Sequence, residues 1–380
     1  MNRDALVARI RAEVASGLDP GAMLNAYADP ARRRTLHERV RRAARAELSE
    51  SEVASLSAEL FGFGVLQALL DDPTVTDVLV NAADEIYVER DGALERAEVG
   101  FADTAQITEL AHRIAAGVGR ELTLERPFVD ARMRDGSRAN AVIAPVGGPT
   151  LSIRTFRRRS VPLRGPAPSW TSDDSLPPAA ADLLADAVVA RANILIVGAT
   201  GAGKSTLLRS LAAEIPADER LVVIEDTNEL VLPHPHVVHL ESMAGRESGV
   251  GTAELVANAL RMRPDRIIVG EVRTPREASA LLDALSTGHD GSLTTAHAGS
   301  ARGAIDRLEL LLARAGESAP EAIRRHVLSA FDLVVHVARN GPRRVIGEIV
   351  AIEDGTLHPL YVRPDASVAA LPAKLRKRGS

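Results

Sequence analysis

The chain has 380 residues, of which 46% are hydrophobic, and carries a formal net charge of −5 at pH 7. This length predicts two globular domains plus an appendage rather than one core. The absence of cysteine excludes a disulfide framework and thiolate zinc sites, as expected of a protein of the reducing cytosol. The charged N-terminus and the lack of any run near about 18 apolar residues predict neither a signal peptide nor a membrane span.

Residues 1–55 are expected to form a charged, helical N-terminal segment. Its basic stripe consists of Arg32, Arg33, Arg34, Arg39, Arg41, Arg42 and Arg45. The stripe is either a surface for acidic partners, anionic lipid or nucleic acid, or a solvated helix face balanced by Glu38 and Glu47.

Residues 56–160 predict a smaller α+β domain. A helix is expected over Ile107–Val118, and Asp91-Gly92 and Asp135-Gly136 are typical of hairpin turns. The expected strands are Val75–Val80, Glu85–Glu89, Leu94–Val99, Phe128–Arg134, Ser137–Ala144 and Thr150–Phe156. Residues 161–178 contain five prolines and predict a linker.

Residues 179–365 alternate between apolar strands and helical segments, which predicts an α/β domain with a mostly parallel sheet flanked by helices. The expected strands are Leu221–Glu225, Arg266–Val269, Ser292–Ala296 and Leu333–Ala338. Residues 366–380 form a basic tail, and its Lys374, Arg376, Lys377 and Arg378 predict disorder.

A complete phosphate-binding loop occupies residues 198–205, which read Gly-Ala-Thr-Gly-Ala-Gly-Lys-Ser. A buried-strand pattern precedes the loop and a helical pattern follows it, as this motif requires. Backbone N–H groups of such a loop bind phosphates at the helix N-terminus. The sequence therefore predicts a nucleoside-triphosphate site with Mg²⁺, in which Lys204 contacts the β- and γ-phosphates and Ser205 binds the metal. The expected binding residues are Gly198, Thr200, Gly201, Ala202, Gly203, Lys204, Ser205 and Thr206.

Two predicted strands end in acids, at Glu225-Asp226 and at Glu271. The carboxyl ends of parallel strands line the crevice where α/β sheets bind ligands. One acid would accept a proton from the attacking water and the other would hold the Mg²⁺ shell, although acids at these positions also cap helices.

His289 and His297 bracket a segment with two glycines and two threonines, which predicts a phosphate-sensing switch rather than two packed histidines. His234, His236 and His239 have only Glu241 nearby as a further metal ligand, so we expect no metal there.

The order of these features resembles that of the secretion-system traffic ATPases, which power type II and type IV secretion and type IV pilus dynamics. Within this superfamily, the phrase LRMRPDRIIVGEVR and the segment TGHDGS resemble the CpaF/TadA branch, which drives assembly of tight-adherence (Flp) pili. The matching boxes are Walker A at Gly198–Ser205, the acidic box at Ile224–Glu229, Walker B at Arg266–Arg273 and the histidine box at Thr287–His297.

The resemblance implies roles for individual residues. Glu225 matches the general base, and Glu229 and Glu271 match acids of the Mg²⁺ shell. His289 and His297 match the histidine box. Arg138 and Arg154 match arginines that the N-terminal domain places against the γ-phosphate, with Arg132 as a third candidate. Residues 241–251 contain less arginine than the family pattern, which puts the intersubunit contacts there in doubt.

The resemblance also implies a cytoplasmic, ring-forming ATPase, most simply a hexamer, with a RecA-like motor domain. Its domains would rock about residues 161–178 and act on an inner-membrane platform protein, with peripheral membrane association through partners. One alternative is a conjugation-type secretion ATPase that moves protein or DNA complexes. Another is a nucleotide-gated nucleic-acid-binding protein, which the net acidity and 3% aromatic content disfavour.

Overall fold

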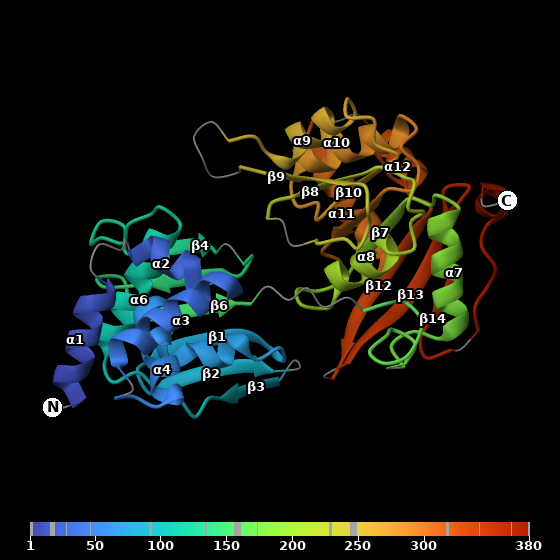
Figure 1. The fold of residues 1–380 in the computed structure, drawn as a ribbon. Helices are drawn as coiled ribbons and strands as arrows, with labels where there is room; N and C mark the ends of the chain where they lie inside the picture. Colours follow the sequence, from blue (N-terminus) through green and yellow to red (C-terminus); the bar gives the residue numbers. More distant parts are fainter. Residues whose placement is uncertain are drawn as a thin grey trace. The chain divides into compact units, whose positions relative to one another are not determined.

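The chain forms two compact units, Met1–Arg157 and Arg158–Ser380 (Figure 1). The boundary expected at residue 55 falls inside helix α4 (Glu50–Phe61), so the N-terminal helices belong to the same unit as the sheet that follows. The computed structural model describes residues 3–15, 20–27, 29–45, 47–90, 93–133, 135–155, 161–172, 174–227, 230–243, 249–316, 319–341, 343–365 and 367–378. Asp91-Gly92, Arg134, Phe156 and Glu229 therefore lie outside the described residues.

The first unit opens with a small helical bundle that has its own apolar core. Ile10, Val40 and Phe61 are fully buried in it. Asp29 caps α3, and Ser49 forms a capping box at the start of α4, so short polar residues fix both helix starts. The helices before α4 are α1 (Arg3–Ala15), α2 (Pro20–Tyr27) and α3 (Pro30–Ala44).

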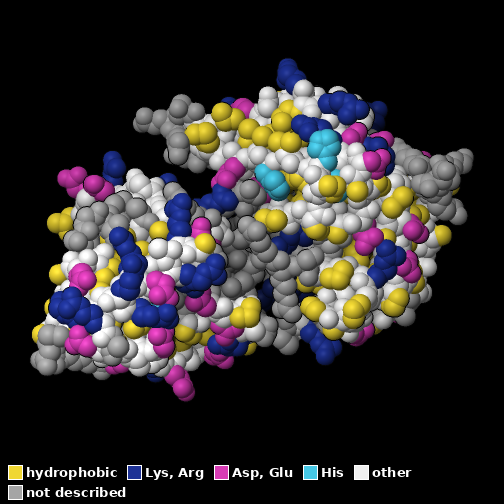
Figure 2. All heavy atoms as spheres, in the orientation of Figure 1, with side chains coloured by type: hydrophobic (Ala, Val, Ile, Leu, Met, Phe, Trp, Pro, Cys, Tyr) yellow, Lys and Arg dark blue, Asp and Glu magenta, His cyan; other side chains and the backbone are white. Residues whose placement is uncertain are grey.

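Acidic residues pair with some of the arginines of the basic stripe on α3. Arg33 binds both carboxylate oxygens of Asp71 at 2.9 and 3.0 Å. Arg41 contacts Glu38 and Glu50 at 2.5 and 2.6 Å. Figure 2 shows basic and acidic side chains interspersed over the visible face of the first unit. These pairs support the interpretation of the stripe as a solvated, charge-balanced helix face.

The first unit also contains a six-stranded sheet of order β3-β2-β1-β6-β5-β4. Side chains alternate along each strand, and those on one face, such as Val78 and Ile153, pack against helix α6 (Thr104–Gly117). This helix confirms the one predicted over residues 107–118. The strands are β1 (Val75–Ala82), β2 (Glu85–Arg90), β3 (Ala93–Arg96), β4 (Phe128–Arg132), β5 (Arg138–Val142) and β6 (Thr150–Arg154), with η1 (Gly64–Leu66) and α5 (Gln67–Asp71) before them.

The second unit is built on an eight-stranded sheet of order β14-β13-β12-β7-β11-β10-β8-β9. The strands from β12 to β9 run parallel, which confirms the predicted α/β class. These strands are β7 (Ile194–Val197), β8 (Leu221–Glu225), β9 (Val237–Glu241), β10 (Arg266–Val269), β11 (Leu293–Ala296), β12 (Leu333–Asn340), β13 (Arg343–Glu353) and β14 (Thr356–Val362).

Helices cover both faces of this sheet (Figure 1). Ile194 and Ile196 of β7 face a core that includes α7 (Pro178–Val189) and α8 (Lys204–Ala212). Leu195 and Val197 face the opposite core. The helices of that second core are α9 (Thr252–Ala259), α10 (Pro275–Ser286), α11 (Ala301–Arg314) and α12 (Pro320–Ala330).

The structure adds antiparallel strands that the sequence did not predict. β13 pairs antiparallel with β12 and with β14. β14 is the edge strand of the sheet, where a proline such as Pro359, which has no backbone N–H, is tolerated.

Residues 161–178 differ from the expected free linker. Leu163, Trp170 and Leu176 are buried in the core of the second unit. Trp170 Nε1 donates to Ser210 Oγ of α8 at 2.9 Å. The prolines shape a packed segment, and its apolar residues attach it to the sheet domain. These residues are thus part of the second unit rather than a free linker, and the expected rocking of the domains stays a prediction.

The C-terminal residues also differ from the expected disordered tail. Helix α13 spans Ala373–Arg378, and Leu375 is fully buried. Lys374 Nζ lies 2.7 Å from Asp332 Oδ1. One apolar side chain and one ion pair thus attach a segment that composition alone marks as disordered.

No single helix of the described chain has the length and apolarity to cross a membrane; the bent pair of α4 and Gly64–Asp71 passes only when its two parts are counted together.

Candidate nucleotide-binding site

The phosphate-binding loop lies between β7 and α8, as the sequence predicts. Gly201 and Gly203 have φ of 70° and 109°, a left-handed conformation that favours glycine. A Cβ on Gly198 would stand 2.3 Å from Val337 O, so the β12 backbone also requires glycine where the loop begins. Four fully buried residues of β7 anchor the loop in the sheet.

Lys204 is the first residue of α8, and its ammonium group is turned into the loop. Its Nζ donates to Gly198 O and Ala199 O at 3.1 Å each. It also lies 3.2 Å from His297 Nδ1. Burial lowers the pKa of Lys204, and the charge of Glu271 opposes that shift. The two carbonyl oxygens and the imidazole nitrogen thus hold the ammonium group at the place where phosphate oxygens would bind.

A charged network extends from Lys204 to the neighbouring strand ends. His297 Nε2 lies 2.7 Å from Glu271 Oε1. Glu271 Oε2 accepts from Arg273 Nε at 2.8 Å, and Arg273 Nη1 donates to Asp226 Oδ2 at 3.2 Å. Because an ammonium group only donates, His297 Nδ1 must be its unprotonated acceptor. Burial is the main cause that lowers the pKa of His297, which favours this neutral imidazole.

Glu225 ends β8 and is buried beside the Walker B strand. Its two oxygens share the Leu230 N–H at 3.0 and 3.1 Å. A Cβ on Gly270 would stand 2.9 Å from Glu225 Cγ, so glycine at that position lets the carboxylate approach β10. Glu225 and Glu271 thus follow neighbouring parallel strands at the same edge of the sheet.

His289 does not lie with His297. Its Nδ1 is 3.2 Å from Ala284 O at the end of α10. His289 precedes β11 whereas His297 follows it, and the two ends of this four-residue strand are about 10 Å apart. Only His297 therefore reaches the phosphate-binding loop of the same chain, and the two histidines do not form one cluster.

Two of the three residues expected to bind Mg²⁺, Ser205 and Glu271, are described by the structure and have suitable oxygen atoms. Ser205 is exposed in the first turn of α8, with Thr206 beside it. Glu271 supplies a carboxylate, whose Oε1 already lies 2.7 Å from His297 Nε2. Hydroxyl and carboxylate oxygens are the ligands that Mg²⁺ prefers. Glu229, the third expected ligand, lies outside the described residues.

The candidate arginines of the first unit form a row across its sheet. Arg132 pairs in register with Arg138, and Arg138 with Arg154. All are on the face opposite α6, because their strand neighbours Ala131, Ala139 and Ile153 are in the core. Arg154 Nε donates to Asp77 Oδ1 at 3.0 Å. The three arginines thus lie side by side on one face of the sheet, and their contact with a phosphate stays a prediction.

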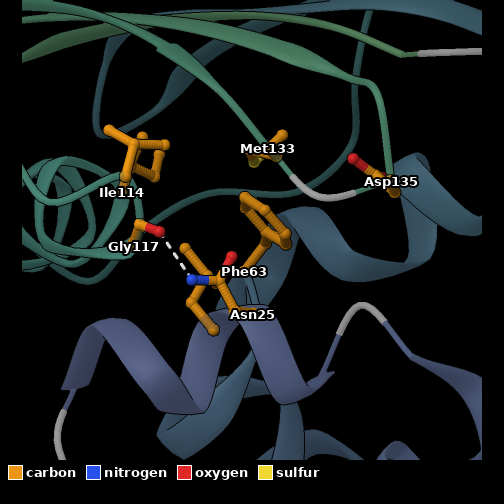
Figure 3. Close-up of a pocket in the computed structure, with 8 residues that line it drawn as sticks. Asn25, Phe63, Ile114, Gly117, Met133 and Asp135 are labelled. Carbon is orange, nitrogen blue, oxygen red and sulfur yellow. Dashed lines mark hydrogen bonds between the residues drawn. The ribbon is translucent and has the colours of Figure 1, made fainter.

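A cavity in the first unit fits a triphosphate poorly. Figure 3 shows Phe63, Ile114 and Met133 around it, with Asn25 Nδ2 donating to Gly117 O at 2.5 Å. Among the residues that the structure describes, no cationic side chain lines this cavity, and Asp135 contributes negative charge.

The family model for type II/IV secretion system proteins matches residues 59–341. The chain belongs to this family. This membership confirms the predicted superfamily, whereas the CpaF/TadA branch stays a prediction.

Similar proteins extend over most of the chain. It is 39% identical over 321 residues to a putative conjugal transfer protein of Mycobacterium tuberculosis strain H37Rv, covering 80% of this chain and 90% of the relative. It is 34% identical over 332 residues to the type IV secretion system protein VirB11 of Brucella suis biovar 1, covering 79% of this chain and 92% of the relative. The X-ray structure of the Legionella pneumophila ATPase DotB matches with a TM-score of 0.58 and 23% identity, over 76% of this chain and 80% of that chain, which supports the fold.

Sequence reasoning did not assign roles to two residues of this secretion-family site, Arg273 and Asp226. Asp226 accepts from Ser242 and Thr252 at 3.0 Å each, and Arg273 joins it to Glu271. Their signal was present, because Asp226 follows a strand directly and Arg273 lies two residues after the Walker B glutamate. What the sequence did not give was their pairing across 47 residues of chain.

Proposed function

We propose that this chain is an ATP-hydrolysing motor of a type IV secretion or conjugal-transfer apparatus. The observation that carries the proposal is the contact chain from Lys204 in the phosphate-binding loop through His297 to Glu271. The names of the secretion and conjugal-transfer relatives support the type of apparatus.

In this proposal the loop binds the triphosphate through its backbone N–H groups and Lys204. The phosphates replace Gly198 O and Ala199 O as partners of the ammonium. A Mg²⁺ ion, when bound, neutralises phosphate charge, and Ser205 and Glu271 would hold it together with Glu229. Glu225 would accept the proton of the attacking water after its carboxylate has lost the hydrogen bond from the Leu230 N–H.

The arginine row of the first unit would supply positive charge to the transition state. Arg138 and Arg154 would contact the γ-phosphate, with Arg132 as the third member of the row. An arginine in this role contributes roughly 10³–10⁵ in turnover. His297 would sense the γ-phosphate through its contact with Lys204. His289 would act elsewhere, because it does not reach the loop.

The test is ATP turnover and nucleotide binding by the purified full-length protein. Lys204→Ala is expected to lose nucleotide binding. Glu225→Gln should still bind but turn over roughly 10²–10⁴ times more slowly, and Arg154→Ala should lose turnover while keeping ADP binding. Arg96→Ala is the matched control, because Arg96 is an exposed arginine on the same sheet, hydrogen-bonded to Asp84 O. Full activity of Lys204→Ala would exclude this site.

We further propose that the motor works as a ring of identical subunits, most simply a hexamer, at the cytoplasmic face of the inner membrane. It would act on a membrane platform protein and associate with the membrane through partners. Mass measurement in solution, with and without an ATP analogue, tests the ring. A mass that stays monomeric under both conditions argues against it.

A pilus-assembly motor is the second candidate function. It is favoured by the residues LRMRPDRIIVGEVR and TGHDGS, which resemble the tight-adherence pilus branch. Deleting the gene separates the candidates, because the first expects loss of protein or DNA transfer and the second loss of surface pili.

A further inference from the structure

Two arginines of the β12–β13 hairpin lie against the phosphate-binding loop. Arg344 Cδ is 2.8 Å, and its Nε 3.6 Å, from where a Cβ on Gly203 would stand. Arg339 Nη2 is 4.0 Å from the corresponding position on Gly201. These are the two left-handed glycines of the loop. The sequence assigned a role to neither arginine.

The sheet fixes the arginines at this place. β12 pairs with β7 up to His336 and Val197, and it then continues while β7 turns into the loop. Val335 and Val337 of β12 face the core that contains α8. Because side chains alternate, Arg339 continues the same face. Arg344 does so from β13, two residues before Ile346, which lies in that core.

The two guanidinium groups concentrate positive charge beside the loop. Arg339 and Arg344 are directly opposite each other in the antiparallel register. Guanidinium groups suit phosphate oxygens better than ammonium groups do, because their donors are planar and paired.

We propose that Arg339 and Arg344 bind the α- and β-phosphates of the nucleotide held by their own subunit. This inference rests on the proposed ATP site. The glycines of such a loop bind the α- and β-phosphates, whereas the lysine reaches the β- and γ-phosphates. The loop is thus flanked by His297 after β11 on one side and by the arginine pair after the paired part of β12 on the other. This pair contributes equally to ATP and ADP affinity, unlike a γ-phosphate arginine.

The experiment is calorimetric titration of the full-length protein with Mg²⁺-ADP and with a non-hydrolysable Mg²⁺-ATP analogue. Arg339→Ala and Arg344→Ala are each expected to weaken both ligands about 10-fold, and the double variant about 100-fold, since each removes a charge-assisted hydrogen bond. Arg344→Lys should recover part of the affinity. Arg343→Ala is the matched control, because this exposed arginine is next to Arg344, on the other face of β13, opposite Asn340.

Two results would overturn the inference. One is unchanged ADP affinity in the double variant while Lys204→Ala loses binding in the same assay. The proposed ATP site would then be supported, but without a role for the arginine pair. The other is a loss restricted to the ATP analogue, which would place the arginines at the γ-phosphate. If the wild type binds neither ligand, the proposed function fails together with the inference. The lysine variant keeps the test valid if an alanine variant misfolds.

Discussion

The contacts that a charged or titratable side chain makes in this protein depend on its position along a strand or helix. His297 and His289 lie eight positions apart in one motif, yet only His297 contacts Lys204. Arg266 starts the Walker B strand but is fully buried and binds Glu219 through two hydrogen bonds of 2.7 and 2.8 Å. Residue type alone thus does not reveal which charged side chain lies beside the phosphate-binding loop and which one is buried in the core; the position on the strand does.

The neutral state of His297 predicts a pH dependence. The folded-state pKa of His297 is lowered, so its contribution to stability is complete above the unfolded pKa of about 6.5 and is lost as pH falls through the lower folded value. Protonation would also give Nδ1 a hydrogen facing the Lys204 ammonium. Urea unfolding between pH 8 and pH 5 should show a smaller loss of stability for His297→Gln than for wild type. His289→Gln, away from the loop, is the control and should follow wild type. Parallel curves for wild type and His297→Gln would contradict this assignment.

The buried Arg266–Glu219 pair predicts a large stability effect. Arg266→Met leaves Glu219 without its two-point partner and frees Val188 O, which Arg266 Nη1 binds at 2.7 Å. We expect a loss of about 3–5 kcal/mol of unfolding free energy, the usual cost of breaking a buried pair. Arg266→Met combined with Glu219→Leu should recover much of that loss, since no buried charge remains. Denaturant unfolding measures both, and a single variant as stable as wild type would show that the pair is dispensable.

At the level of elements, the regular parts of the motor sheet were predictable and the irregular parts were not. The strands at Leu221–Glu225 and Arg266–Val269 match their predicted bounds, because buried parallel strands are uninterrupted apolar runs. β13 and β14 were missed, since they contain charged residues, Gly347 and Pro359. The prolines in residues 161–178 predicted a linker, but Leu163, Trp170 and Leu176 pack the segment into the core of the second unit.

The packed segment at 161–178 predicts that its tryptophan stabilises the motor unit. Trp170→Ala should cost about 3–5 kcal/mol of unfolding free energy, because it leaves a cavity beside α8. Trp170→Phe should cost less, since it loses mainly the hydrogen bond to Ser210. Pro166→Ala, at an exposed position of the same segment, should change stability by less than about 0.5 kcal/mol. Circular dichroism melts compare the variants, and an unaffected Trp170→Ala would restore the free-linker interpretation.

At the scale of the whole molecule, the two units have separate cores. The apolar clusters of the first unit draw only on residues before 158, and those of the second only on residues after it. The sequence predicted the α/β motor and the α+β domain, because their motifs and strand periods differ. It separated the N-terminal helices from the α+β domain, since a change in composition does not reveal that two segments pack together.

This separation predicts that Arg158–Ser380 folds and binds nucleotide without the first unit. If the arginine row of the first unit supplies the transition-state charge, as we propose, the fragment should hydrolyse ATP roughly 10³–10⁵ times more slowly than the full chain. Turnover per bound nucleotide, measured on both, tests this. Full-length Arg138→Ala with Arg154→Ala should match the fragment. Equal rates for fragment and full chain would show that the motor unit supplies every group the reaction needs.

The chain contains one tryptophan, Trp170, which is hydrogen-bonded to the helix that begins with Lys204 of the proposed nucleotide site. Its intrinsic emission is therefore a label-free optical reporter of this helix. A shift of helix α8 when a nucleotide arrives would alter the indole's surroundings and hence its spectrum. The protein thus carries its own fluorescent probe at the place where its proposed chemistry begins.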